Sequence, residues 1–104
     1  MYIVILVTAK DKIEAQKIAS KLVSEKLVAC ANIIDNVRSI FWWESKVDSA
    51  NEVLLIFKSK KTLFKKIEKT VKSIHSYSVP EIIALPIIVG EKTYLKWIED
   101  SVKK

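Results

Sequence analysis

The sequence contains one glycine, two prolines, one cysteine and one histidine among its 104 residues. A single cysteine cannot form a disulfide within the chain, so we expect a fold that does not depend on an oxidising compartment. The longest apolar stretches, Met1–Val7 and Ile82–Val89, are much shorter than the ~20 residues that a membrane-spanning helix requires. The chain opens with an apolar run in place of a basic region and shows no small-residue cleavage site. We therefore expect a soluble cytoplasmic protein that does not contact a membrane.

The shortage of glycine, cysteine and histidine also removes the common catalytic and nucleotide-binding motifs. The sequence has no phosphate-binding P-loop, no dinucleotide-binding glycine loop, no H-E-x-x-H and no C-x-x-C. Cys30 and His75 are the one pair of residues that could form a nucleophile and its general base, and the sequence shows no third residue to orient the base. We therefore expect a protein that is not an enzyme and that uses no organic cofactor.

What the chain does contain is the balance of an ordinary globular protein, 50% apolar and 29% charged. Its length suits one domain over residues 1–104, because two halves would each approach the lower limit of independent folding. Seventeen lysines and one arginine give a net charge of +6. Many of these lysines fall on the outward faces of expected helices, so we interpret them as solvated charge, and nucleic acid is an unlikely partner. Abundant Lys and Glu with a single Gln are typical of thermostable proteins.

The spacing of apolar residues predicts the order strand, helix, strand, strand, helix, strand, helix. This is the split βαβ arrangement of ferredoxin-like α+β domains, with a long hairpin and an extra C-terminal helix. Right-handed crossovers place the first and third strands in the middle of the sheet and both main helices on one face. The expected strands are Tyr2–Val7, Val28–Trp43, Glu52–Ser59 and Glu81–Val89; the expected helices are about Lys12–Lys26, Leu63–Ile74 and Tyr94–Val102.

Three local signals refine this arrangement. The polar pair Asp35-Asn36 predicts a bend in the long second strand, and the polar segment Glu44–Asn51 predicts a hairpin connection. Pro86 predicts an edge position or a bulge for the fourth strand, because proline has no N–H to donate to a neighbouring strand. The second strand would measure roughly 50 Å at ~3.3 Å per residue, so we expect its far end to project from the domain.

The projecting end carries large apolar side chains that a monomer would not leave as an open patch. The fourth strand is apolar on both alternating faces, although one layer of helices can cover only one of them. We therefore expect another copy of the chain to cover these surfaces; the predicted interface residues are Phe41, Trp42, Trp43, Ile83 and Leu85. An alternative in which the strand bends back and the aromatic side chains cover their own sheet stays open.

Four segments, taken in order, resemble the CutA divalent-cation-tolerance family, and the resemblance covers nearly the whole chain. They are Leu27–Ile33 (LVACANI), Ile40–Val47 (IFWWESKV), His75–Ile83 (HSYSVPEII) and Tyr94–Trp97 (YLKW). The resemblance implies a tight homotrimer of ferredoxin-like domains whose shape is similar to that of the PII signalling proteins. It also implies a function in the tolerance of divalent cations, especially copper, and copper binding.

Cys30 and His75 are the only soft or imidazole ligands besides Met1, so they are our candidate ligands for copper or another divalent cation. Two alternatives remain open. Cys30 is alternatively a small buried residue of its strand. His75 is interpreted equally well as a cap on the carboxyl end of the second helix.

The resemblance further implies a ligand pocket in the cleft between subunits; its candidate residues are Trp43, Lys58, His75, Tyr77 and Glu81. Lys58 and Glu81 are alternatively an ion pair. The pocket suggests a second function, a small-molecule sensor of the PII type. A third, an RNA-binding domain, lacks the required Gly-aromatic pattern on its third strand.

Three serines depart from the family pattern. Ser45 stands where the family usually has glycine, and we expect it to mark a turn that does not demand positive φ. Ser76 replaces a proline and leaves the approach to Tyr77 less rigid. Ser78 replaces an acidic residue, so a site built on the segment from His75 to Glu81 would differ from that of the family.

Overall fold

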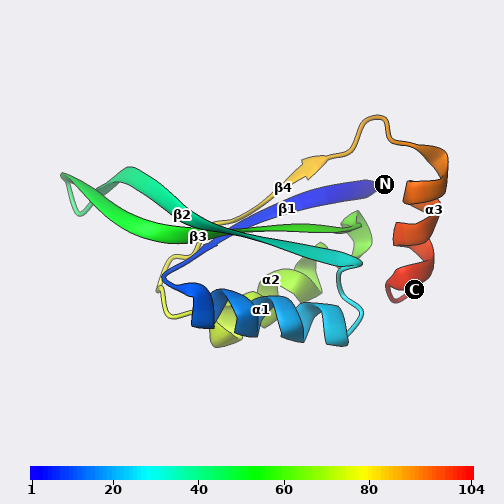
Figure 1. Ribbon diagram of the computed structural model, residues 1–104, viewed down its shortest axis with the longest axis horizontal. Helices are drawn as coiled ribbons and strands as arrows, with labels where there is room; N and C mark the ends of the chain where they lie inside the picture. The colour runs from blue at the N-terminus through cyan, green and yellow to red at the C-terminus, as the bar shows by residue number, and fades with distance from the viewer.

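The computed structural model describes all of residues 1–104 as a four-stranded antiparallel sheet with three helices (Figure 1). The elements are β1 (Tyr2–Ala9), α1 (Lys12–Ser24), β2 (Cys30–Trp43), β3 (Lys46–Lys60), a 3-10 turn (Lys61–Leu63), α2 (Phe64–Ile74), β4 (Ile82–Pro86) and α3 (Lys92–Ser101). The strand order β2-β3-β1-β4 confirms that the first and third strands lie in the middle. No helix is both long enough and apolar enough to cross a membrane.

The core lies between the sheet and the helices α1 and α2, which cover the same face (Figure 1). Side chains alternate along β1, so that Ile3, Ile5 and Val7 point toward these helices and are buried. α1 begins where the sequence predicts, because the Asp11 carboxylate accepts a hydrogen bond of 2.8 Å from the backbone N–H of Glu14. Seventeen buried apolar residues form one continuous cluster, with Phe57 of β3 fully buried within it.

The predicted hairpin connection Glu44–Asn51 is too long, because β3 already begins at Lys46. The turn consists of Glu44 and Ser45 alone, with φ values of 49° and 67°. Two successive positive φ values are typical of a type I′ turn, whose twist matches that of the strands it joins. The expectation that Ser45 marks a turn without positive φ is therefore wrong.

The fourth strand is also shorter than the predicted Glu81–Val89. At its C-terminal end the reason is that β1 begins at Tyr2 and has no further residues to pair with it. Pro86 pairs with Ile3, and the Ile87 N–H donates to the Tyr2 carbonyl at 2.9 Å, one residue from the start of the chain. β4 is an edge strand, as Pro86 predicts.

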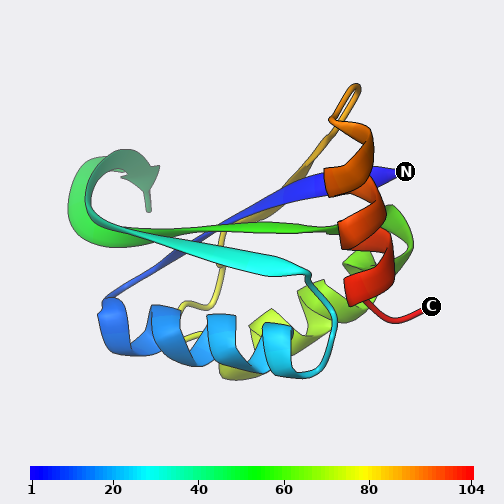
Figure 2. The ribbon, with the colours of Figure 1, turned by 45° about the vertical axis from the view of Figure 1, so that its right-hand side comes forward.

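The bend predicted at Asp35-Asn36 is confirmed as a β-bulge. The pairing of β2 with β3 shifts register between Ile34 and Val37, and Asn36 has a φ of 59°. Bulges increase local twist, and beyond this one the hairpin projects from the domain and curls away from α1 and α2 (Figure 2). The molecule consequently measures 44 Å along its longest axis and 25 Å and 23 Å along the others.

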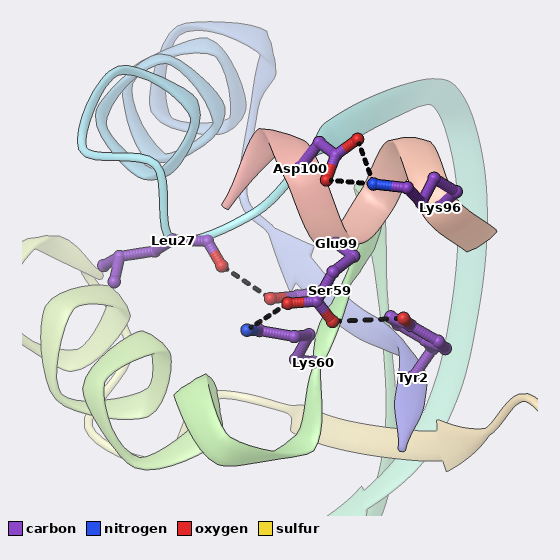
Figure 3. Close-up of polar contacts among 7 residues, drawn as sticks. All are labelled: Tyr2, Leu27, Ser59, Lys60, Lys96, Glu99 and Asp100. Atoms are coloured by element: carbon purple, nitrogen blue, oxygen red, sulfur yellow. Dashed lines mark hydrogen bonds and ion pairs between the residues drawn. The ribbon is translucent and has the colours of Figure 1, made fainter. Parts of the chain in front are cut away.

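The opposite end of the sheet is closed by α3 (Figure 3). Glu99 of α3 accepts a hydrogen bond of 3.1 Å from the Tyr2 hydroxyl and one of 3.0 Å from the Lys60 ammonium. Close by, the fully buried Ser59 hydroxyl donates to the Leu27 carbonyl at 2.6 Å. Ile98, a residue of α3, is fully buried. At this end the chain supplies partners for its own polar groups.

Candidate functional site

The face of the sheet turned away from α1 and α2, here called the uncovered face, carries apolar side chains that the chain leaves exposed. Ile83 and Leu85 of β4 are 50% and 52% exposed, and Ile34 of β2 is 44% exposed. Two of these three, Ile83 and Leu85, are predicted interface residues. The expected surplus of apolar surface on this face is therefore present.

The other predicted interface residues lie on the projecting part of the hairpin. Phe41, Trp42 and Trp43 are 38%, 74% and 45% exposed. The hairpin does curl, but these aromatic side chains do not become buried against their own sheet, as the alternative interpretation required. They remain available to another molecule.

A groove of about 870 Å³ runs between the curled hairpin and the loop that leads from α2 to β4. Trp43 lines one wall, and Tyr77 and Glu81 line the other. The hairpin also contributes Phe41, Asp48 and Glu52. Three of the five residues predicted for a ligand pocket, Trp43, Tyr77 and Glu81, therefore come together within one chain.

The groove is acidic and partly shielded from water. Glu52 is only 8% exposed and accepts a hydrogen bond of 2.9 Å from the Tyr77 hydroxyl. Burial, and then this hydrogen bond to Glu52, raise the pKa of Tyr77 to about 12, so Tyr77 stays protonated and donates. Burial, followed by repulsion from Glu52, raises the pKa of Glu81. The two carboxylates are therefore close enough for the charge of Glu52 to act on Glu81, although Glu52 is buried and Glu81 is exposed.

His75 lies behind the groove and holds the loop in place. Its Nδ1 accepts a hydrogen bond of 3.0 Å from the Tyr77 backbone N–H, so Nε2 carries the proton and donates to the Thr8 carbonyl at 2.7 Å. The side chain of His75 is fully buried. His75 follows α2 directly, as the cap interpretation requires, but its ring bonds β1 and the loop in place of the helix carbonyls. A metal ion at His75 would have to replace one of these two hydrogen bonds.

Glu14 of α1 supports the same loop from the other side. Its carboxylate accepts hydrogen bonds from the backbone N–H groups of Ser76, at 2.6 Å, and Lys10, at 3.0 Å. Burial alone would raise the pKa of Glu14, but these hydrogen bonds outweigh it and lower the pKa. The loop is thus anchored at Ser76 although the family's proline is missing there.

Cys30 and Lys58 lie elsewhere on the uncovered face. The two residues face each other across β2 and β3, and the Lys58 ammonium donates to the Asn32 side-chain oxygen and approaches the Cys30 sulfur at 3.8 Å. Lys58 does not line the groove, and it forms no ion pair with Glu81 within the chain.

The two candidate metal ligands are far apart in one chain. Cys30 pairs with Lys58 of β3, which in turn pairs with Val4 of β1. His75 instead forms a hydrogen bond with Thr8, four residues or ~13 Å further along β1. No group of three or more His, Cys, Asp or Glu side chains is close enough to hold a metal ion. The residues of a single chain therefore do not make a closed metal site, and they do not assemble a Cys30–His75 dyad.

Sequence reasoning missed the buried acidic residue of the groove, Glu52. The available signal was Glu52 itself, a carboxylate directly before the apolar run Val53–Phe57 of a central strand. A buried carboxylate at that position needs a hydrogen-bond partner, and the Tyr77 hydroxyl supplies one.

The fold and the groove define the chain as a ferredoxin-like α+β protein with a projecting β-hairpin. The model of the family described as CutA1 divalent ion tolerance protein matches residues 3–101. The chain is 42% identical over 102 residues to the protein CutA 1, chloroplastic, of Oryza sativa subsp. japonica, covering 98% of this chain and 58% of that protein. It is 41% identical over 103 residues to the divalent-cation tolerance protein CutA of Archaeoglobus fulgidus, covering 99% of this chain and 100% of that protein.

A solved structure agrees with these relatives. The divalent cation tolerance protein (Cut A1) from Thermus thermophilus matches with a TM-score of 0.97 at 40% identity, covering 99% of this chain and 100% of that one. The chain therefore belongs to the CutA1 divalent ion tolerance family. It spans somewhat more than half the length, 58% and 56%, of the plant relatives it matches.

Proposed function

We propose that this chain acts in the tolerance of divalent cations as a homotrimer that binds copper or a related ion, as a binding or signalling module and not as a catalyst. The observation that carries the proposal is the match of nearly the whole chain, residues 3–101, to the divalent ion tolerance family. The relative from Archaeoglobus fulgidus carries the same function in its name, divalent-cation tolerance protein. The cytoplasm is the proposed location; the Oryza relative is named chloroplastic, so fractionation of the source cell is the check.

The uncovered face supports the trimer. Ile83 and Leu85 of β4 and Trp42 of the hairpin are each at least half exposed, and large exposed apolar side chains of this kind mark contacts between chains. A hairpin that projects from its own domain reaches a neighbouring copy more readily than its own core. Three copies arranged in this way would resemble the PII proteins in shape.

The metal assignment requires more than one chain. One copy supplies only Cys30 and His75 as soft or imidazole ligands, and they lie far apart. Cys30 is partly exposed on the uncovered face, so copies that meet on this face bring further ligands toward its thiol. His75 is the weaker candidate, because both of its ring nitrogens already hold hydrogen bonds.

Two measurements test the proposal. Sedimentation equilibrium at micromolar concentration should give three times the mass of 11.9 kDa; a monomer would contradict the assembly. Titration with copper(I), copper(II) and zinc should give binding that Cys30→Ala weakens at least about tenfold, because even the outer partners of metal ligands contribute that much to affinity. Equal affinity of the wild type, Cys30→Ala and His75→Ala would contradict the metal assignment and leave the fold untouched.

The groove supports a second candidate function, a small-molecule sensor. Pockets for small molecules typically measure about 300–1,000 Å³ and combine aromatic walls with a few polar groups. The groove of about 870 Å³, with Trp43, Tyr77 and Glu81 around it, falls in this range. A ligand bound there would contact the hairpin and the loop together, and so would influence any assembly built on the hairpin.

A further inference from the structure

The positive charge of the chain is concentrated on one short segment, Lys61–Lys72, which comprises the 3-10 turn and most of α2. The segment contains five lysines and one carboxylate, that of Glu68, and so carries a net charge of +4. The rest of the chain accounts for only +2 of the total of +6. The five lysines, here called the basic stripe, are Lys61, Lys65, Lys66, Lys69 and Lys72.

The lysines of the basic stripe differ from those of other elements in having no partner. All five are exposed, and neither they nor Glu68 form an ion pair. Lysines of α1, β3 and α3, in contrast, lie 2.7–3.0 Å from carboxylates. On α2 the apolar side chains Ile67 and Val71 are buried, and the lysines fall on the opposite side of the helix. The charge of the stripe is therefore free to act on another molecule.

This placement of lysines does not stabilise α2. Lys65 and Lys69 are like charges one helical turn apart, an arrangement that destabilises a helix. Lys65 and Lys66 lie in the first turn, where the helix dipole disfavours cations, and only Lys72, in the last turn, suits the dipole. The first turn has no acidic residue, and Leu63 at the N-cap makes no side-chain hydrogen bond. Contact with an anionic molecule would offset the repulsion that the helix leaves uncompensated.

The basic stripe stays accessible in an assembly that forms on the uncovered face. α1 and α2 cover the other face of the sheet (Figure 1), and the hairpin curls away from them (Figure 2). None of the predicted interface residues lies on α2. A monomer and a trimer therefore present the same stripe.

The chemistry of the stripe separates the classes of anionic partner. No large apolar or aromatic side chain is exposed between residues 61 and 74. Protein interfaces are built around such anchors and are depleted in lysine, and single-stranded nucleic acid is bound by stacking its bases on aromatic side chains. A partner that binds here has to bind by charge alone.

The geometry of the stripe matches a linear array of phosphates. Lys65, Lys69 and Lys72 form a row of ~10 Å at ~1.5 Å per residue. One strand of a duplex carries a phosphate every ~3.4 Å of its axis, which gives about three phosphates over the same length. A lipid surface extends in two dimensions and is matched less well by a single row.

We propose that the basic stripe binds the phosphate backbone of a nucleic-acid duplex, by charge and without reading the base sequence. The composition of the whole chain did not indicate this partner, because it does not distinguish the lysines of α2 from those that are paired elsewhere. The proposal goes beyond the function in divalent-cation tolerance and does not depend on it.

Fluorescence anisotropy with a labelled DNA duplex of mixed sequence tests the proposal on the full chain in its native assembly. Between about 50 and 200 mM salt, the slope of log K against log salt should be about −2.7 or steeper, since each neutralised phosphate contributes about −0.9. In Lys65→Gln/Lys69→Gln/Lys72→Gln the slope should be shallower by about 2.7, and affinity at about 50 mM salt should fall at least about tenfold. A duplex of unrelated sequence should bind equally well.

A variant with the same net charge is the matched control. It replaces three exposed lysines outside α1 and α2, as Lys46→Gln/Lys92→Gln/Lys104→Gln. Because charges further away than the Debye length of about 10 Å are screened, its affinity should stay within about threefold of that of the wild type. Circular dichroism melting of the α2 variant should give a melting temperature equal to or above that of the wild type, because the substitutions remove like-charge repulsion.

Three outcomes would overturn the proposal. They are no binding of the duplex by the wild type at about 50 mM salt, equal losses in the two variants of equal charge, and displacement of the duplex by phosphatidylserine vesicles or polyglutamate at equal charge. The third would assign the stripe to a lipid surface or to an acidic protein. An RNA duplex titrated in parallel shows which backbone binds more tightly, and binding of either that the α2 variant loses supports the proposal. The copper titration does not involve these lysines, so a failure here leaves the metal-tolerance function untouched.

Discussion

The two halves of β3 belong to different parts of the molecule. From Val53 to Lys60 the strand lies against the helices or beneath α3, where Phe57 and Ser59 are fully buried and Lys60 pairs with Glu99 at 3.0 Å (Figure 3). From Lys46 to Asn51 it forms the projecting hairpin with β2 (Figure 2). Nearly every side chain of this segment is exposed. We call these the closed half and the open half.

The comparison separates the residues that stabilise the folded protomer from the residues that stay exposed to other molecules. In the closed half Val53, Leu55 and Phe57 are buried in the core of the same chain, and no buried polar side-chain atom lacks a hydrogen bond. In the open half Trp42 is 74% exposed although it is one of the largest apolar side chains in the sequence. Its burial contributes nothing to folding of the protomer, so its size is explained by contact with another molecule.

Substitution of one aromatic residue in each half tests this division most strongly. Phe57→Ala should lower the free energy of unfolding by about 3–5 kcal/mol, because it opens a cavity in the core. Trp42→Ala should change the unfolding free energy of the protomer by no more than about 0.5 kcal/mol but should shift sedimentation toward smaller species. Guanidinium unfolding and analytical ultracentrifugation measure the two effects. If Trp42→Ala unfolds like Phe57→Ala and sediments like the wild type, the division is wrong.

Two serines of β3 give a smaller version of the same contrast. Ser59→Ala leaves the buried Leu27 carbonyl without its donor, which should cost about 1–3 kcal/mol. Ser49→Ala, at an exposed position in the open half, should stay within about 0.5 kcal/mol of the wild type. Thermal unfolding of both variants is the measurement. Equal losses would mean that the open half is packed as tightly as the closed half.

The sequence predicts the closed half well because local and global signals agree there. The run Val53–Phe57, the cap at Asp11 and the apolar stripe of α2 each have one satisfactory arrangement, which is to cover the sheet on one face. The Asp35-Asn36 bend was also predictable, since a polar pair interrupts an otherwise apolar strand.

The open half was predicted less well because its signals conflict. The polar residues of Lys46–Asn51 favour a loop, but pairing with β2 supplies hydrogen bonds for the backbone and extends the strand to Lys46. The groove was missed in part for a related reason. Glu52 and Glu81 are far apart in the sequence, and only the folded chain brings Glu52 within hydrogen-bonding distance of Tyr77, on the loop that precedes Glu81.

The tip of the hairpin allows a test in which the open half becomes more stable. Ser45 has a φ of 67°, a left-handed conformation that costs a residue with a Cβ more than glycine. Ser45→Gly should therefore raise the free energy of unfolding by about 0.5–1 kcal/mol. Ser49→Gly, in the adjacent extended strand, should lower it by about 0.5–1 kcal/mol. A loss of stability in Ser45→Gly would show that the turn relaxes in solution to negative φ.

The smallest expected effect concerns the charge of Glu81, which links the open half to pH. Burial, and then Glu52, raise the pKa of this carboxyl, so the folded state holds its proton more tightly than the unfolded state does. Its contribution to stability is therefore fully present below pH ~4 and is lost as the pH rises through the folded pKa. Glu81→Gln cannot ionise, so it should match the wild type at pH 4 and exceed its stability at pH 7.

The expected gain is about 0.5 kcal/mol or less, because Glu81 is partly exposed and solvent screens the repulsion. Urea unfolding of the wild type, Glu81→Gln and Glu68→Gln at pH 4 and pH 7 measures it, with Glu68→Gln expected to follow the wild type. A gain that is equal at both pH values would trace the effect to packing in place of charge.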